Sequence, residues 1–569
     1  MKYTNNNNEL TIKDVNKIVY LKGWVAKKRN LGGLIFIDLR DRFGITQIIV
    51  KPENENYELA SQVRVEYVIE VKGVVVERES KNPNIKTGEI EIIASSLVIL
   101  STSETPPIIV SDDTDASEEV RLKYRYLDLR RPIMQDYLIK RHKIAIAARN
   151  FLSKEGFYEL ETPILGKSTP EGARDFLVPA RLYKGEFYAL PQSPQLYKQL
   201  FMIAGFEKYF QIARCFRDED LRADRQLEFT QIDVEASFVD QKDIIKLTEK
   251  LFKYIFKQVL DLNIKTPFLK MTYKEAMNKY GSDKPDNRFE LFLNDYKAIF
   301  SEYNIPIFKS KRYVKGIIAK TNLSRKEIDK YTITVKQNHG ESLAFLKVVD
   351  GEISGSIAKF VDKDIIGKIG LKENETLLLV PGDYEDVSQS LGALRLQIAE
   401  DYKLYDENEY SFLWVTDFPL LEYDKEDKRF YARHHPFTAP KDVDMLKNNP
   451  KKCLAKAYDI VINGYEVGGG SIRIHNEEVQ KLMFETLSLT KVDIEERFGF
   501  FVEALKYGTP PHGGIAFGLD RLVMLITKTR NIKDVIAFPK TQSARDLMMQ
   551  APSTVDEKQL VELNISIKE

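Results

Sequence analysis

The sequence predicts a multidomain α+β protein, and three observations support this class. The chain has 569 residues, which is long for one hydrophobic core and favours about two to four domains. Its hydrophobic content of 43% and charged content of 30% are those of globular proteins. Short β-branched segments fill roughly the first 105 residues, whereas helical spacing alternates with strands further along.

Charge and cysteine content exclude several classes of protein. Lys plus Arg and Asp plus Glu both number 85, so the chain cannot coat nucleic acid through bulk positive charge and would bind it through local patches. Two cysteines, Cys215 and Cys453, exclude a disulfide framework and favour a cytoplasmic protein. The N-terminus lacks the apolar core of a signal peptide, and no apolar run reaches the length of about 20 residues that a membrane span needs.

The N-terminal region, 1–105, contains five segments typical of strands, at residues 19–25, 32–41, 45–50, 67–77 and 88–100. Five short strands favour a small barrel, and the OB-fold is the commonest host for that number. The next stretch is acidic, carries prolines and has no periodicity, which is typical of a linker or hinge. We therefore place a barrel domain at 1–105 and a linker at 106–122.

The remainder divides into three parts. In 123–285, apolar residues at helical spacing lead to Gly156 as a helix stop and then to a strand. Residues 286–405 mix helix and strand with few clustered polar groups, as an inserted module would. Residues 406–569 return to strands separated by glycines.

The segment from Tyr209 to Glu235 predicts two strands joined by a charged loop. Because strand side chains alternate, one face of this hairpin would carry Arg217, Glu219, Phe229, Gln231 and Asp233. An ordinary solvated hairpin is one interpretation. The other is a nucleotide platform, in which an aromatic ring stacks a base and arginines bind a polyphosphate.

A second segment favours the nucleotide platform. In residues 513–525 a glycine-rich strand leads through a tight turn to a helix that begins near Leu519, with Arg521 in its first turn. Helix N-termini attract anions, and an arginine there can bind a terminal phosphate. A surface arginine at an ordinary strand-to-helix turn is the alternative, but together the two segments describe a nucleotide held between two arginines.

These segments resemble motifs of the class II aminoacyl-tRNA synthetases, most closely the bacterial aspartyl-tRNA synthetases. "FRDE" at 216–219 resembles motif 2, "GLDR" at 518–521 resembles motif 3, and residues 151–165 resemble motif 1, which forms the dimer interface in that class. The resemblance continues in order along nearly the whole chain, at residues 23–44, 168–181, 189–200, 463–475 and 534–541. The inserted module resembles the GAD domain of the bacterial form.

The resemblance implies an N-terminal OB-fold, an antiparallel-sheet catalytic domain and an inserted α+β GAD domain. It implies activation of L-aspartate by ATP with Mg²⁺, then transfer to tRNA(Asp), in a homodimer. The implied catalytic residues are Arg217, Glu219 and Arg521. The implied ATP-binding residues are Arg217, Asp218, Glu219, Gln226, Phe229, Glu466, Gly518, Leu519, Asp520 and Arg521. Asp459 and Glu466, on two strands flanking an Asn-Gly turn, would hold Mg²⁺.

Selection of aspartate over asparagine is expected to depend on positive charge, since the two amino acids are similar in size. The resemblance places Lys198 and Arg473 in this role, with Asp233 holding Lys198. The complete implied aspartate site is Glu171, Gln195, Lys198, Arg217, Gln231, Asp233, His434 and Arg473. The pair His434 and His435 could suggest a metal, but no third ligand has suitable spacing.

The barrel is expected to bind the anticodon through Arg29, Phe36 and Gln47. Ile49 stands where the family often has an aromatic residue, which puts one stacking contact in doubt. Leu31 stands where non-discriminating bacterial forms tend to carry histidine, and this favours an enzyme specific for tRNA(Asp). The alternative is a non-discriminating form that also aspartylates tRNA(Asn). Two further alternatives remain. The GAD resemblance disfavours an asparaginyl- or lysyl-tRNA synthetase, and the intact motifs disfavour a non-catalytic RNA-binding relative.

Overall fold

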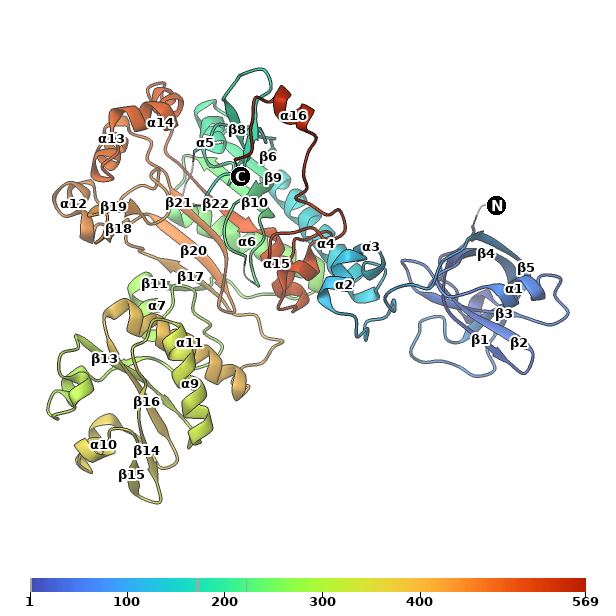
Figure 1. The fold of residues 1–569 in the computed structure, drawn as a ribbon, viewed down its shortest axis with the longest axis horizontal. Coiled ribbons are helices and arrows are strands. Elements are labelled where there is room, and N and C mark those ends of the chain that lie inside the picture. The colour runs from blue at the N-terminus through green and yellow to red at the C-terminus, as the bar shows by residue number, and fades with distance from the viewer. Residues whose placement is uncertain (1–2, 170–172, 222, 569) are drawn as a thin grey trace. The chain divides into compact units, whose positions relative to one another are not determined.

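The computed structural model describes residues 3–169, 173–221 and 223–568. The chain forms two compact units. The first contains residues 1–140, 221–226 and 531–555, and the second contains residues 141–220, 227–530 and 556–569. Figure 1 shows the elements of both units along the chain. The predicted multidomain α+β class is confirmed.

The first unit contains a closed five-stranded barrel with strand order β1-β2-β3-β5-β4. Its strands are β1 (Ile18–Leu31), β2 (Leu34–Arg40), β3 (Ile45–Val50), β4 (Val68–Glu77) and β5 (Ile90–Ser101), with the short helix α1 (Tyr57–Gln62) between β3 and β4. Alternate residues such as Leu21, Ile37 and Val71 point inward and are fully buried. All five predicted strands are present. A Cβ on Gly23 would lie 2.3 Å from the carbonyl oxygen of Arg40, so the barrel requires glycine there.

The rest of this unit is organised around one buried arginine. Helices α2 (Glu118–Lys123) and α3 (Arg125–Asp128) follow a stretch without regular structure. Arg125 donates hydrogen bonds to the backbone carbonyls of Lys533, Ile536 and Ala537 and pairs with Asp128 at 2.6 Å. These bonds fasten the segment after η5 (Ile532–Val535) to α3.

The second unit is built on an eight-stranded sheet of order β11-β17-β20-β21-β22-β10-β9-β6. The pairs at the two ends are parallel and the central ones are antiparallel. The strands are β6 (Tyr158–Glu159), β9 (Lys208–Phe216), β10 (Glu228–Ser237), β11 (Leu269–Thr272), β17 (Phe412–Thr416), β20 (Ala457–Ile462), β21 (Tyr465–Ile472) and β22 (His512–Gly518). The predicted hairpin is β9–β10.

Helices flank this sheet. The helices outside the barrel and the inserted module, from α4 onward, are α4 (Pro132–Lys154), α5 (Gln195–Ile203), α6 (Gln241–Leu260), α7 (Tyr273–Tyr280), α12 (Val443–Asn448), α13 (Glu477–Thr486), α14 (Lys491–Leu505), α15 (Leu519–Thr527) and α16 (Glu557–Glu562). The predicted stop after α4 is Gly156, whose φ of 85° is left-handed and favours glycine. Two small hairpins, β7 (Leu177–Pro179) with β8 (Phe187–Ala189) and β18 (Leu421–Asp424) with β19 (Arg429–Ala432), project from the loops.

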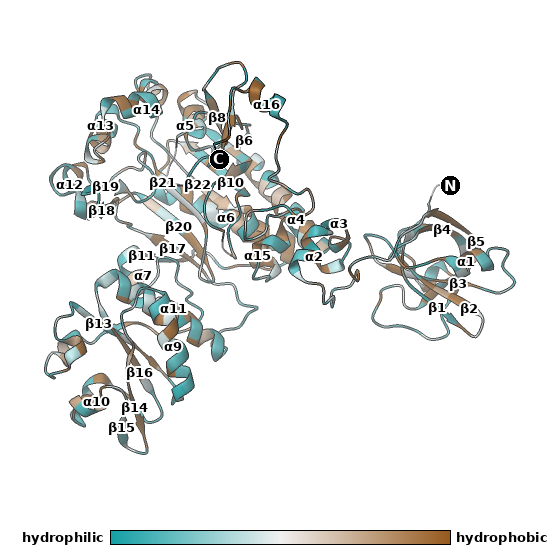
Figure 2. Cartoon of the chain, in the orientation of Figure 1, coloured by the Kyte–Doolittle hydropathy of each residue, from teal (hydrophilic) through white to brown (hydrophobic). Residues whose placement is uncertain are grey.

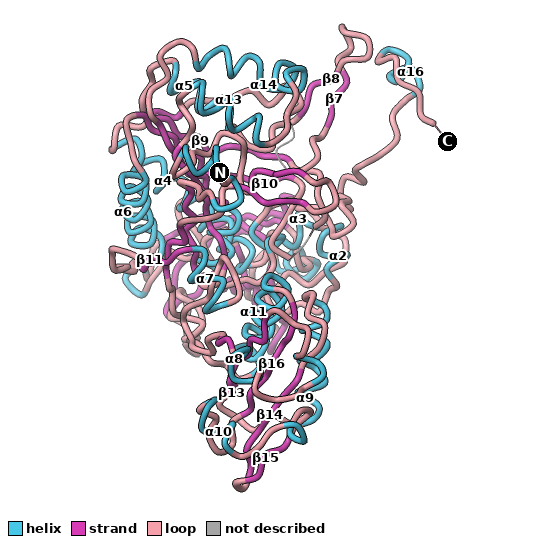
Figure 3. The backbone as a smooth tube through the Cα atoms, turned by 90° about the vertical axis from the view of Figure 1, so that its left-hand side faces the viewer, coloured by secondary structure: helices cyan, strands magenta, loops and turns pink. Residues whose placement is uncertain are grey.

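A second sheet lies between α7 and β17 in sequence, as expected for an inserted module. Its order is β12-β13-β16-β14-β15, and its strands are β12 (Asn294–Asp295), β13 (Tyr313–Ala319), β14 (Ala344–Val349), β15 (Glu352–Ser354) and β16 (Thr376–Gly382). Helices α9 (Arg325–Gln337) and α11 (Tyr384–Asp401) pack on one face. Helices α8 (Lys297–Phe300) and α10 (Asp364–Ile369) pack on the other. Figure 3 shows the strands between α10 and α9, and Figure 2 shows the outward surface of α9 as largely hydrophilic.

No helix among the described residues is long and apolar enough to cross a membrane.

Candidate active site

The floor of the candidate site is a row of residues that crosses four neighbouring strands. The registers align Asp233 of β10 with Ala516 of β22, Ala516 with Gly469 of β21, and Gly469 with Asp459 of β20. Aligned residues in a sheet point to the same face. The row therefore carries an acid at each end and only small residues between them, which leaves open space above the centre of the sheet.

Glycines in this floor make room for carboxylates. A Cβ on Gly514 would lie 1.9 Å from Oε2 of Glu235, and a Cβ on Gly469 would lie 2.8 Å from Oδ1 of Asp459 and 3.5 Å from Oε1 of Glu466. Asp459 and Glu466 thus converge above Gly469. A β-bulge at Ile460/Val461 sets this arrangement, because it shifts the register just before Glu466.

The residues of the predicted nucleotide platform lie at the end of the β9–β10 hairpin where the connecting loop begins. Phe229 is paired with Cys215 in the ladder, and Arg217 follows directly after β9. The Arg217 guanidinium lies over the Phe229 ring, 5.1 Å from its centroid. Among the described residues, its Nε has no hydrogen-bond partner. Glu219 and Asp218 are half-buried in the loop beside them, where the Asp218 amide donates to the Arg174 carbonyl at 3.1 Å.

The strand-to-helix turn predicted near Leu519 is present, with α15 beginning at that residue after the N-cap Gly518. Arg521 is half-buried and donates to the Glu466 carbonyl at 2.5 Å, which ties motif 3 to the carboxylate pair. Leu519 is buried in the core. Asp520 is also buried: it pairs with Arg141 of α4, and its Oδ2 accepts from the Thr230 amide at 2.7 Å. These contacts show Asp520 holding α15 against α4 and β10.

The carboxylate pair has the electrostatics of a cation site. Burial, followed by the charges of Glu466 and Asp283, raises the pKa of Asp459 well above its usual value. Its Oδ1 is buried and has no hydrogen-bond partner in the described part of the chain. Oxygen ligands of this kind suit Mg²⁺, which takes few protein carboxylates and fills its shell with water and phosphate. No group of three or more His, Cys, Asp and Glu side chains that could hold a metal ion is found among the described residues.

The predicted cationic pocket is a buried network of four charges. Lys198 of α5 donates to Oδ1 of Asp233 at 2.7 Å and lies 3.2 Å from Oε2 of Glu235. Arg473, just after β21, binds both oxygens of Glu235, with Nε–Oε1 2.9 Å and Nη2–Oε2 3.1 Å. All four side chains are at most 2% exposed, so two positive and two negative charges balance inside the protein.

The pKa values of the two acids differ because their partners differ. Burial would raise the pKa of Glu235, but Arg473 and Lys198 outweigh it and hold that pKa at about 2. Burial raises the pKa of Asp233, and Lys198 offsets only part of that rise. Oδ2 of Asp233 has no partner among the described residues, so it can accept from a ligand. Glu235 is not among the predicted site residues, because its pairing with Arg473 joins segments 238 residues apart and leaves no local pattern in the sequence.

Two histidines lie beside this network. His435 is in contact with Arg473 (Nε2···Nη1 2.6 Å), and burial together with that charge lowers the pKa of His435 well below its usual value. His434, the predicted residue, packs against Phe418, and burial and Arg433 lower its pKa to about 4. Both rings are therefore neutral at pH 7. The sequence analysis chose His434, whereas the contact with Arg473 is made by its neighbour.

The other predicted aspartate ligands are placed as follows. Gln195 begins α5, and its Nε2 is buried without a partner in the described part of the chain. Gln231 is half-buried, and its Oε1 accepts from the Cys215 thiol at 3.3 Å. Glu171 lies outside the described residues. Gln226, which the resemblance implies as an ATP-binding residue, belongs to the first unit. Its amide makes two hydrogen bonds with the backbone of Lys540.

The predicted RNA-binding residues of the barrel form one polar cluster. Arg29 pairs with Asp38 at 2.9 Å, donates to Gln47 at 3.1 Å and lies 5.9 Å from the Phe36 ring centroid. Gln47 also accepts from Arg78 and donates to Glu91, two residues absent from the prediction. Ile49 pairs directly with Phe36 in the sheet and is 7% exposed. A buried aliphatic side chain therefore occupies the position where the family often has an aromatic residue.

Comparison with known proteins identifies the family. The family model described as "tRNA synthetases class II (D, K and N)" matches residues 117–542, and the one described as "OB-fold nucleic acid binding domain" matches residues 19–100. The chain belongs to the class II aminoacyl-tRNA synthetases. Within them it groups with aspartate–tRNA ligases. A relative from Caldanaerobacter subterraneus subsp. tengcongensis named "Aspartate--tRNA(Asp/Asn) ligase" is 52% identical and covers 100% of this chain and 98% of that protein.

A second curated relative agrees with this assignment, and two solved structures show the same fold. A Bacillus cereus protein of the same name is 52% identical over 98% of each chain. The structure of asparaginyl-tRNA synthetase from Pyrococcus horikoshii with asparaginyl-adenylate shares the class II fold, with TM-score 0.60 and 22% identity over 93% of this chain and 96% of that one. The aspartyl-tRNA synthetase from Entamoeba histolytica gives a TM-score of 0.59 at 20% identity, over 95% and 91% of the two chains. Class II synthetases use ATP, which agrees with the predicted substrate.

The carboxylate pair of this synthetase predicts a pH-dependent response to Mg²⁺. The folded-state pKa of Asp459 is raised, so the folded protein holds a proton on this carboxyl that the unfolded chain has already released. The free energy of unfolding therefore decreases as the pH rises above the pKa of Asp459 in the unfolded chain. A divalent cation removes that cost only when the carboxyl is ionised. We expect Mg²⁺ to raise the unfolding temperature more at about pH 8 than at about pH 5.5.

Thermal unfolding with and without MgCl₂ measures this effect. Asp459→Asn should abolish most of the Mg²⁺ response and leave the metal-free protein no less stable, while Asp444→Asn, at an exposed acid of α12, should behave as the wild type. An equal Mg²⁺ response in the wild type and Asp459→Asn would place the cation elsewhere.

Proposed function

We propose that this protein is an aspartate–tRNA ligase that forms aspartyl-adenylate and pyrophosphate from L-aspartate and ATP, then transfers aspartate to the 3′ end of tRNA. The observation that carries the proposal is the buried pair Lys198 and Arg473, held by Asp233 and Glu235 on the floor of a class II sheet. Lys198 and Arg473 carry only N–H donors, so a substrate carboxylate that replaces water above them can accept the hydrogen bonds that Asp233 and Glu235 leave unfilled.

The same argument explains rejection of asparagine. Its amide has nearly the volume of the aspartate carboxylate, so shape separates the two poorly. The amide would present N–H donors to Lys198 and Arg473, whose side chains also carry only donors and therefore cannot accept them. Leaving buried cations without an acceptor costs on the order of several kcal/mol, enough for a selectivity of 10³ or more.

ATP would bind at the other end of the floor. Phe229 would stack the adenine, Arg217 would neutralise the α-phosphate and the attacking carboxylate, and Arg521 would bind the γ-phosphate. The position of the Arg217 guanidinium over the Phe229 ring, 5.1 Å from its centroid, supports this arrangement. Glu219 and the turn Gly518–Leu519 would line the nucleotide, as would Asp218 and Gln226. The contacts of Asp520 favour a supporting role instead.

The residues Asp459 and Glu466 fit a Mg²⁺ ion that would neutralise the phosphates when bound. Their own contribution is geometric: the β-bulge and Gly469 direct both carboxylates to one point on the floor. Gln195, Gln231 and His434 would complete the aspartate pocket. The neutral state of His434 means that it would act through hydrogen bonding and not through charge.

We also propose that the enzyme charges both tRNA(Asp) and tRNA(Asn). The named relatives carry "tRNA(Asp/Asn)" in their names at 52% identity, and this favours the non-discriminating alternative over the specificity for tRNA(Asp) that Leu31 suggested. Leu31 ends β1 at the tip of a two-residue hairpin, 60% exposed and two positions from Arg29. A single side chain there does not outweigh the relatedness over the full length of the chain.

The test is aminoacylation of two transcripts, tRNA(Asp) and tRNA(Asn), with labelled aspartate and purified protein. Charging of both at comparable kcat/KM is expected. If only tRNA(Asp) is charged, the non-discriminating proposal is wrong while the ligase proposal stands, and if neither is charged the ligase proposal fails. Alanine at Phe36 should reduce kcat/KM for both transcripts by roughly 10-fold or more, since a stacked base contributes about 1–3 kcal/mol.

We further infer the division into domains 1–105, 106–122, 123–285, 286–405 and 406–569, and a homodimer through motif 1. The separate barrel and the second five-stranded sheet support the division. Light scattering of the purified protein would show twice the chain mass of 65.7 kDa if the dimer forms.

A further inference from the structure

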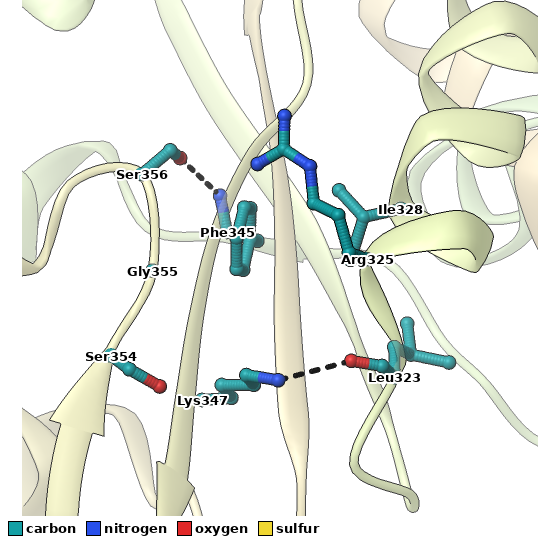
Figure 4. A pocket seen from close by; sticks show the side chains of 8 residues that line it. All are labelled: Leu323, Arg325, Ile328, Phe345, Lys347, Ser354, Gly355 and Ser356. Carbon is teal, nitrogen blue, oxygen red and sulfur yellow. Dashed lines mark hydrogen bonds between the residues drawn. The ribbon is translucent and has the colours of Figure 1, made fainter.

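The inserted module contains a cavity that plays no part in the proposed reaction. Helices α9 and α11 cover the central strands β13 and β16 through a shared apolar core. The edge hairpin β14–β15 extends beyond them, and a cavity of about 300 Å³ remains between it and the start of α9. Figure 4 shows its lining: Leu323, Arg325, Ile328, Phe345, Lys347, Ser354, Gly355 and Ser356.

Lys347 gives this cavity a positive charge. Its ammonium donates to the side-chain oxygen of Asn322 at 2.9 Å and to the carbonyl of Leu323 at 3.1 Å. Both acceptors are neutral, and no carboxylate of the described residues lies within ion-pair distance of this ammonium. An ammonium has three donors, so one remains for a ligand and its full charge is uncompensated.

Arg325 supplies a second cation at the rim. Its Nε pairs with Asp329 one turn along α9, at 3.1 Å on an exposed surface, and its terminal nitrogens remain able to donate. The acid offsets one of the two positive charges, so the cavity carries a net charge of about one. The N-terminus of α9 is not expected to bind the ligand, because Ser324 and Glu327 already form a capping box with its backbone N–H groups.

The remaining lining is half polar and half apolar. Ser354 is aligned with Lys347 in the ladder and lies on the same face. The Ser356 hydroxyl accepts from the Phe345 amide at 2.9 Å, which leaves its own proton to donate. Leu323 and Ile328 are buried and Phe345 is half-buried, and these three residues supply the apolar part of the lining.

We propose that this cavity binds a small organic monocarboxylate with an apolar body, its carboxylate at Lys347, with Arg325 at the rim, and its hydrocarbon part against Phe345 and Ile328. The net charge of about one matches a single carboxylate, whereas a phosphate dianion would leave one charge unpaired. A volume of about 300 Å³ is at the lower end of ligand pockets and admits a compact molecule. The site lies on a different sheet from the aspartate pocket, and it does not depend on the proposed function.

The probe for a test is 4-fluorophenylacetate, followed by ¹⁹F NMR with the full-length protein. We expect saturable broadening of its resonance that excess L-aspartate with ATP does not reverse. Lys347→Met should weaken the affinity roughly tenfold or more, because it removes the uncompensated charge. Arg325→Gln, at an exposed position that should not affect folding, should weaken it several-fold, and Lys326→Gln on the same turn of α9 is the matched control.

Four results would overturn the proposal: no saturable binding, unchanged affinity in both Arg325→Gln and Lys347→Met, displacement by aspartate, or displacement by inorganic phosphate as readily as by hexanoate. The neutral 4-fluorophenylacetamide should not bind, and equal binding of this amide would also refute a carboxylate site. Activity of the enzyme is not the readout, so failure here leaves the ligase proposal untouched.

Discussion

Arg473→Gln is expected to reduce kcat/KM for aspartate in ATP–pyrophosphate exchange by roughly 10²–10³-fold. Arg473 is 2% exposed and binds both oxygens of Glu235. Removing one partner of a buried charge pair costs about 2–5 kcal/mol, and each factor of ten in rate corresponds to about 1.4 kcal/mol. The loss should fall mainly on aspartate, so the preference for aspartate over asparagine should shrink as well.

Controls separate this effect from misfolding. Arg312→Gln, at an exposed arginine before β13, should retain full exchange activity. Glu235→Gln should resemble Arg473→Gln, because Glu235 positions both Arg473 and Lys198. If a well-folded Arg473→Gln protein activated aspartate at the wild-type rate and still rejected asparagine, the charge-based pocket would be refuted.

Arg217→Lys is expected to lower kcat for adenylate formation by roughly 10²–10³-fold, the usual cost of losing one donor that stabilises a transition state. Lysine keeps the positive charge but loses the planar fork that can bind a phosphate and a carboxylate together. It also loses the contact with the Phe229 ring, over which the guanidinium lies at 5.1 Å. Single-turnover formation of aspartyl-adenylate measures the effect directly.

Arg214→Lys is the matched control, since Arg214 lies three residues before Arg217, on β9, and is exposed. It should leave the rate within about twofold of the wild type, as surface substitutions usually do. A drop confined to KM for ATP, with kcat unchanged in Arg217→Lys, would contradict a role for Arg217 in the transition state and leave it only a binding role.

Much of the site could be predicted because its signals are local in the sequence. The alternation in β9 and β10, the Asn463–Gly464 hairpin and the turn before Arg521 each depend on a few adjacent residues. All three are observed, as are the five strands of the barrel and the α+β class. The partnership of Lys198 with Asp233 followed from the resemblance, and the 2.7 Å contact is present.

What escaped prediction depends on contacts between distant segments. Glu235 meets Arg473 across 238 positions of the chain, and Asp520 meets Arg141 across 379. Neither pairing leaves a local pattern. Two adjacent histidines are equivalent in sequence, and only the loop conformation decides that His435 is the one in contact with Arg473, while the substrate-binding role of His434 stays a prediction. The hydrogen bonds between the Gln226 amide and the backbone of Lys540 likewise join segments 314 residues apart, and the ATP-binding role of Gln226 stays a prediction.

The most direct test of the central claim, a buried cationic pocket that selects aspartate for adenylation, is ATP–pyrophosphate exchange with the purified protein and each amino acid in turn. Exchange that depends on aspartate and Mg²⁺, with asparagine at least about 10³-fold less effective in kcat/KM, is the predicted result. Exchange supported equally by asparagine, or by no amino acid in a folded protein, would contradict it.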